Sequence, residues 1–82
     1  TEHERRQIAD HLRYLMRLGE EGTVILAGPS LEPPRTGIVV FKASSRAEAH
    51  VIMDADPAIK GGIMIGVLSA FSLAVTPGGT EG

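Results

Sequence analysis

Histidine and aspartate are the residue types in this chain best suited to proton transfer, and one of each falls beside an apolar helix face. On a helical wheel His11 lies between Leu15 and Leu18, at the flank of an apolar stripe. Imidazole gains and loses a proton near neutral pH, so a histidine beside a cavity could act as a general acid or base. The same position also suits a boundary histidine that binds a backbone carbonyl, and both interpretations stay open.

Asp56 is the second candidate. It stands one turn beyond Ile52, near the side of a second helical segment that Ile52 and Met53 make apolar. Pro57 fixes how the chain leaves the helix. The carboxylate could face the interior, or it could bind nearby backbone amides in a helix-ending Asp–Pro turn. Asp54 falls on the opposite side of the helix, so these two acids do not predict a paired-carboxylate site.

The remaining motifs give little support for metal or nucleotide chemistry. His3 and His11 are eight residues apart, about 12 Å along a helix, which is too far to share one ion. The chain has no cysteine, which excludes disulfides, zinc ribbons and thiolate nucleophiles. Its glycine-containing segments match neither GxGxxG nor GxxxxGK. The arginines of the first segment have acidic neighbours, which is typical of a solvated face. We expect no metal and no cofactor.

The elements that would position His11 and Asp56 follow in the order α-β-β-α-β. Residues 1–21 predict a helix that opens on a T-x-x-E capping box and turns Ile8, Leu12 and Leu15 toward the core. Residues 23–27 and 38–43 predict strands, the first ending at a Gly-Pro breaker. A second helix starts at Ser45 and stops near residue 55, residues 58–62 form a turn or one helical turn, and residues 63–75 form a third strand. The expected domain covers residues 1–75, with a flexible tail at 76–82, and its class is α+β with the helices on one face of the sheet.

Length and composition narrow the function classes. The chain has 82 residues, a formal net charge of -2 and 43% hydrophobic residues, which describes one small domain. The acidic balance argues against nucleic acid or an anionic membrane as a partner. No apolar run is long enough for a membrane helix, and the start TEHERRQ is unlike a signal peptide, so a cytoplasmic protein is expected. A core this small predicts oligomerisation as a further source of stability.

Taken together, the segments resemble the YCII-related (YciI-like) family. The resemblance runs from residue 1 to about 75 and rests on a combination of pieces. H-x-x-Y-L is followed by AGP, and S-x-x-E-A then leads to D-P, as in HLRYLMRLGEEGTVILAGP and SSRAEAHVIMDADP. No single piece is decisive.

The resemblance implies a ferredoxin-like α+β domain that forms a homodimer. In this dimer the sheets of the two copies come together as a small barrel. The resemblance also implies that His11 and Asp56 form a catalytic dyad, in which the carboxylate fixes the imidazole tautomer and the free nitrogen moves a proton on a small organic molecule. Gly28 and Pro29 match the family's AGP turn, so they are candidate ligand-binding residues that could shape the pocket, or the turn could simply end the strand. The implied activity is of the lyase or isomerase type.

One departure from the family pattern concerns the sheet. The first strand of the ferredoxin-like order, which is central in the sheet, is absent from residues 1–82. Without it the sheet of one chain has a gap and part of the pocket wall is lost. Two functions therefore remain open: a small acid–base enzyme, or a non-catalytic domain for small-ligand binding or dimerisation.

Overall fold

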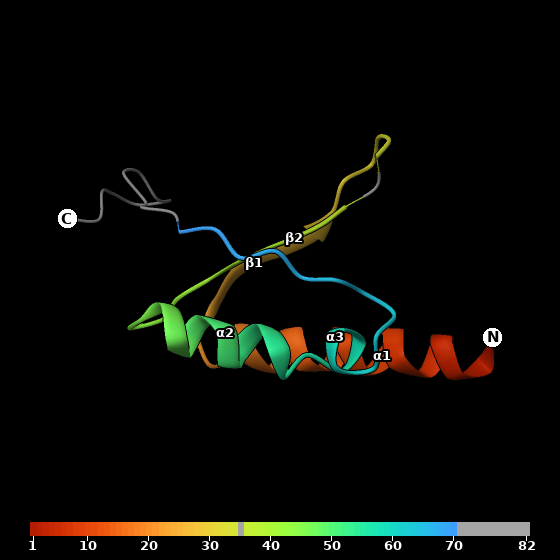
Figure 1. Cartoon of the computed structure of the whole chain (residues 1–82), viewed down its shortest axis with the longest axis horizontal. Helices are drawn as coiled ribbons and strands as arrows, with labels where there is room; N and C mark the ends of the chain where they lie inside the picture. The colour runs from red at the N-terminus through yellow and green to blue at the C-terminus, as the bar shows by residue number, and fades with distance from the viewer. Residues whose placement is uncertain (35, 71–82) are drawn as a thin grey trace.

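A computed structural model describes residues 1–34 and 36–70 of the chain. These residues form an α+β arrangement in the order α1 (Glu2–Glu20), β1 (Val24–Pro29), β2 (Gly37–Phe41), α2 (Arg46–Asp54) and α3 (Pro57–Lys60). The helices lie together in one layer, and the two strands rise from it as a hairpin whose far end points away from the helices (Figure 1). The α+β class predicted from the sequence is thus confirmed. The tail expected at residues 76–82 lies outside the described residues.

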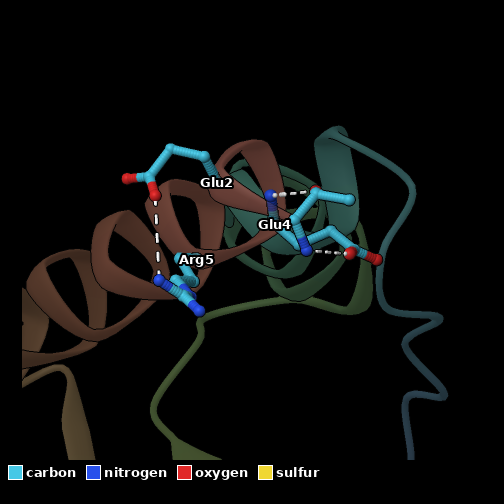
Figure 2. Close-up of polar contacts among 4 residues, drawn as sticks. Glu2, Glu4 and Arg5 are labelled. Carbon is cyan, nitrogen blue, oxygen red and sulfur yellow. Dashed lines mark hydrogen bonds and ion pairs between the residues drawn. The ribbon is translucent and has the colours of Figure 1, made fainter.

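Helix α1 begins where the T-x-x-E pattern predicts. The Thr1 hydroxyl accepts a hydrogen bond from the Glu4 backbone N–H, and the Glu4 carboxylate accepts one from the Thr1 amino group. Arg5 and Glu2 add an ion pair one turn apart (Figure 2). At the other end Gly22 adopts φ +81°, a left-handed conformation that glycine takes without strain. None of the helices in the described ranges is long and apolar enough to span a bilayer.

The hairpin is antiparallel and carries an irregularity between Val24 and Leu26. Its register pairs Gly28 with Ile38 and Pro29 with Gly37, so β1 runs through the Gly-Pro pair that was expected to end it. A proline removes one backbone donor, and a sheet tolerates this loss on a strand that is paired on one side only. The prediction that the strand stops at residue 27 was therefore two residues short.

Asp56 and Pro57 separate α2 from α3. Helix α2 begins at the predicted cap, where the Ser45 hydroxyl accepts from the Glu48 N–H at 3.1 Å. The residue before a proline disfavours helical geometry, and Asp56 has extended dihedrals, φ -62° and ψ 125°. Pro57 then starts α3 from its first position, which suits a residue without an N–H. Residues 58–62 were expected to form a turn or one helical turn, and the structure has the helical turn, α3, which begins one residue earlier and ends at Lys60.

The third strand predicted at residues 63–75 is wrong for the residues that the structure describes. Residues 65–70 form no strand, although exposure alternates, with Ile65 and Val67 almost fully exposed and Gly66 and Leu68 partly buried. A strand also needs a neighbour that takes its backbone hydrogen bonds, and the hairpin does not pair with this segment. Residues 71–75 lie outside the described part.

The apolar face of α1 is only partly covered. Leu18 is buried at 8% exposure, whereas Ile8 and Leu12, which were expected in the core, are 44% and 54% exposed. Two strands are too narrow to cover the whole helical stripe, so the half of it nearer Leu18 packs inside and the other half faces outward. In the described residues, the buried hydrophobic side chains are Leu18 and Ala58, which lie on α1 and α3.

Candidate functional site

His11 and Asp56 meet between α1 and the start of α3, although 45 residues separate them in the chain. Their Nδ1 and Oδ2 atoms are 2.6 Å apart, and the side chains are only 17% and 6% exposed. An ionised carboxylate has no proton to give, so the imidazole Nδ1–H donates and Asp56 accepts. A hydrogen bond of this length to a charged acceptor is of the strong, charge-assisted kind. The tautomer it favours carries its proton on Nδ1 and leaves Nε2 free to accept one.

The second oxygen of Asp56 is also occupied. Oδ1 accepts a hydrogen bond from the Ala58 N–H at 2.9 Å, so Asp56 is the N-cap of α3. The helix-ending Asp–Pro turn and the interior-facing carboxylate were alternatives at the level of the sequence. In the structure the Asp56 side chain combines the two: Oδ1 binds the backbone amide of the turn, and Oδ2 faces inward and binds His11. Because both oxygens are held, the carboxylate cannot rotate away from His11 without breaking its cap.

Tyr14 forms a second link between the same helices. It lies three residues after His11 on α1, and its hydroxyl donates to the Ile52 carbonyl at 2.8 Å. In a continuing helix Ile52 O would accept from the Asp56 N–H, but that N–H donates to Met53 O instead. The phenol therefore takes a carbonyl that is freed where α2 ends. The two contacts from α1, at residues 11 and 14, hold positions 56 and 52 of the facing segment.

The environment of Tyr14 favours its neutral form. Burial raises the pKa of the Tyr14 phenol, and the carboxylates of Asp56 and Glu21 raise it further, while Arg17 opposes them. The Arg17 guanidinium lies 5.3 Å from the centre of the Tyr14 ring, within cation–π range. At neutral pH Tyr14 is thus a fixed hydrogen-bond donor and not an acid.

Among the described residues, one space is lined in part by Tyr14 and Asp56, and another is lined by residues that are near His11 and Asp56 in the chain. The first, here called the inner cavity, is an apolar space of about 60 Å³ between the helices and the hairpin, room for no more than a few waters. It is lined by Tyr14, Leu15, Leu18, Val24, Val39, Phe41, Ile52, Met53, Asp56 and Ile59. The second, here called the outer hollow, is open to solvent and has about 330 Å³. It is lined by Gln7, Asp10, Ala55, Pro57, Lys60 and Gly61. Of these two spaces, the outer hollow is the one of a size to take a small organic molecule.

Gly28 and Pro29 lie at the far end of the hairpin, opposite Ile38 and Gly37, and both are exposed. Neither residue lines the inner cavity or the outer hollow. Within the described ranges, no three side chains of the histidine, cysteine, aspartate or glutamate type gather where a metal ion would bind.

Tyr14, Gln7 and Lys60 lie near the pair in the chain, although no motif in the sequence marks them as parts of a site. Their signal is positional. Tyr14 and Gln7 are at i+3 and i-4 from His11, so they share its helix face, and Lys60 follows Asp56 by one turn of α3. Only the packing of α1 against α3 shows that these positions converge.

We predict that Tyr14 titrates above the ordinary tyrosine pKa of about 10. The chain has one tyrosine and no tryptophan, so near-ultraviolet absorbance of the phenolate reports Tyr14 alone. Because the fold favours the neutral phenol, the unfolded chain loses this proton at a lower pH than the folded chain. Stability is therefore full below pH about 10 and falls as the pH rises toward the raised pKa.

The matched measurement for Tyr14 is the same titration in urea. Asp56→Asn should bring the folded-state midpoint down, because it removes one of the charges that disfavour the phenolate. Identical midpoints for the folded and the urea-unfolded chain would contradict the buried environment described for this side chain.

Comparison with known proteins agrees with the resemblance found in the sequence. No curated protein and no solved structure matches the chain. A family model, that of the YCII-related domain, matches residues 1–68, a span that contains α1, the hairpin and both residues of the His11–Asp56 pair. This span is more than half of the chain, and so the chain belongs to the YCII-related family.

Proposed function

We propose that this protein is a small acid–base enzyme of the lyase or isomerase type, in which His11 moves a proton on a small organic substrate. The observation that carries the proposal is the 2.6 Å contact between His11 Nδ1 and Asp56 Oδ2. A carboxylate in this position orients the imidazole, fixes its tautomer and stabilises the imidazolium that forms when Nε2 takes a proton. His11 is thus the proposed general base and acid, and Asp56 its orienting partner.

The surroundings of the pair support this role. Asp56 is 4% exposed and is the buried charged residue of the described chain. A buried carboxylate is costly unless it is hydrogen-bonded, and both its oxygens are engaged. His11 retains 17% exposure, so the imidazole stays reachable from solvent while its partner does not. This asymmetry is what a general base needs, since the reacting nitrogen must meet a substrate and the orienting group must not.

The alternative is a non-catalytic domain for ligand binding or dimerisation, and one observation favours it. The Asp56 carboxylate also has a structural explanation, because it caps α3 and ties that helix to α1. The two functions make different predictions for His11, since a purely structural pair needs no free Nε2 and promotes no exchange of substrate hydrogens.

Exchange of Asp56 for asparagine should reverse the tautomer of His11. Asparagine is an equally good N-cap, so its Oδ1 can keep the Ala58 N–H while its amide NH2 turns toward His11. Nδ1 must then accept, and the proton moves to Nε2. At alkaline pH, the 15N chemical shift typical of a protonated imidazole nitrogen should therefore be found at Nε2 of His11 in the variant and at Nδ1 in the wild type. The exposed His3 and His50 serve as internal references that stay unchanged. An Asp56→Asn chain with the wild-type pattern at His11 would overturn the dyad.

Catalysis itself is tested by hydrogen exchange. We expect the chain to accelerate deuterium incorporation from D2O at acidic C–H positions of a panel of small hydroxylated and lactone-type compounds. His11→Ala should lower that rate by about 10²–10⁴-fold, the usual contribution of a general base. His50→Ala, which removes an exposed imidazole, is the matched control and should leave the rate unchanged. Equal rates in the two variants would favour the non-catalytic alternative.

We further propose that the chain forms a ferredoxin-like homodimer through the open side of its sheet. Val39 and Phe41 face the inner cavity, so the alternation of β2 turns Ile38 the other way, together with Leu26 of β1. Leu26 and Ile38 are each 54% exposed. Apolar side chains gathered on one sheet face support a covering partner, and a second copy supplies the same face.

Light scattering on the purified chain should give about twice the 8.7 kDa mass of one copy. Leu26→Asp places a charge on the open face and should yield monomers, because that charge would be buried without a partner. Leu31→Asp is the matched control, since Leu31 is 83% exposed in the loop between the strands. A monomeric wild-type chain, or equal dissociation by both variants, would contradict this interface.

A further inference from the structure

The backbone tightens where α2 ends, just before Asp56. In an α-helix each N–H donates to the carbonyl four residues earlier, and the Ala55 N–H still does so, to Val51 O at 3.0 Å. The next N–H, that of Asp56, donates only three residues back, to Met53 O at 3.2 Å. The helix thus closes on a turn of the 3₁₀ type, and this turn sets the position from which the Asp56 side chain starts.

Tyr14 holds the carbonyl that the tight turn leaves out. If α2 continued in α geometry, Ile52 O would accept from the Asp56 N–H. It accepts instead from the Tyr14 hydroxyl at 2.8 Å, the usual length for an O–H donor, whereas the Asp56 contact with Met53 is at the long end for an N–H donor. The phenol therefore occupies the acceptor that would otherwise draw the Asp56 amide back into the helix.

The position of the Asp56 backbone matters because its carboxylate is short and is held at both oxygens. Oδ2 is 2.6 Å from His11 Nδ1, and Oδ1 is 2.9 Å from the Ala58 nitrogen. Two side-chain torsions separate these oxygens from the backbone, so they cannot both follow a change in the last turn of α2. Hydrogen bonds weaken steeply when their angle is lost. The contact with His11 is thus sensitive to the turn that precedes Asp56.

The ring of Tyr14 has an ordinary explanation that its hydroxyl does not share. The ring lines the inner cavity and lies under the Arg17 guanidinium at 5.3 Å, contacts that a phenylalanine would keep. The hydroxyl adds the bond to Ile52 O, which joins α1 to the end of α2. The ring and the hydroxyl can therefore be separated by experiment.

We propose that Tyr14 is a positioning residue for the His11–Asp56 pair, and that its hydroxyl acts by withholding Ile52 O from the Asp56 N–H. The tight turn that results keeps Asp56 Oδ2 on His11 Nδ1. Tyr14 acts on the pair through the backbone and takes no part in moving the substrate proton. This inference rests on the proposed function and deepens it, because it names the group that fixes the geometry of the same site.

The test removes the hydroxyl alone. In Tyr14→Phe, Ile52 O is free to accept from the Asp56 N–H, so a scalar coupling across that hydrogen bond, between the Asp56 amide 15N and the Ile52 carbonyl 13C, should appear that the wild type lacks. The imidazole of His11 should lose its preference for a proton on Nδ1. Its two 15N shifts at alkaline pH should then move toward those of the exposed His3 and His50.

Ser45→Ala is the matched control. It removes a hydrogen bond of 3.1 Å, that from the Glu48 N–H, at the opposite end of the same helix. This variant should keep the wild-type 15N shifts at His11 and should show no new coupling to Ile52. Wild-type shifts at His11 in Tyr14→Phe, or equal changes in both variants, would refute the positioning role.

A second arm needs no loss of the hydroxyl. The chain has one tyrosine, so 3-fluorotyrosine can be incorporated at position 14 alone. Fluorine makes the phenol more acidic, and a phenolate has no proton to donate to Ile52 O. Asp56 and Glu21 oppose this ionisation and Arg17 favours it, as in the wild type. The His11 15N shifts should therefore change at the pH at which 19F NMR reports the phenol titrating, over the range in which circular dichroism stays native. Constant His11 shifts through that titration would contradict the proposal even if Tyr14→Phe failed to fold.

These readouts need no substrate, so the positioning role and the proposed enzyme function can fail separately. A change at His11 in Tyr14→Phe, together with no acceleration of deuterium exchange by the wild type, would keep the positioning role and remove the enzyme function. Where the wild type does accelerate exchange, Tyr14→Phe should lower the rate by about 10²-fold, the order expected when a reacting group is misplaced by about 1 Å. An equal exchange rate in Tyr14→Phe and wild type would keep the function and remove the positioning role.

Discussion

The buried carboxylate of Asp56 is the interaction on which the rest of this structure depends. A charge at 4% exposure is tolerated only when hydrogen bonds replace the water it has lost. One oxygen takes the first free N–H of α3, and the other takes the imidazole of His11. The same residue therefore starts a helix, ties that helix to α1 and fixes the orientation of the histidine. Loss of either partner would leave an acceptor buried without a donor, which couples local helix formation to the geometry of the site.

Tyr14 makes this junction rigid. A single hydrogen bond would let α1 pivot against the α2–α3 segment, whereas contacts at residues 11 and 14 of α1 fix two points along their boundary. The spacing suits the helical geometry, because positions three apart on α1 lie on one face and Ile52 lies one turn ahead of Asp56. The second contact uses a carbonyl freed where α2 ends. The Asp–Pro element thus supplies both the carboxylate for His11 and the acceptor for Tyr14.

Much of the local structure follows from the sequence, whereas the contacts between distant elements do not. The capping pattern at Thr1, the Ser45 cap and the stop before Pro57 are local, so short-range chemistry predicts them. The meeting of His11 with Asp56 spans 45 residues. Residue spacing left two interpretations for each side chain, and only the family resemblance paired them. The third strand is wrong up to residue 70 for a related reason, since a run that is apolar on both faces predicts an extended chain but not the neighbour that would pair with it.

The sheet connects the proposed assembly to the proposed site. Strand β2 presents Val39 and Phe41 to the inner cavity, where Tyr14 and Asp56 also lie, and presents Ile38 to the open side. A two-stranded hairpin has little stability of its own and depends on what packs against its faces. If a second copy covers the open side, it stabilises the same strand that supports the Asp56 junction from within. Folding, dimerisation and orientation of His11 are then linked by mass action, so conditions that separate the copies loosen the hydrogen bond at His11 as well.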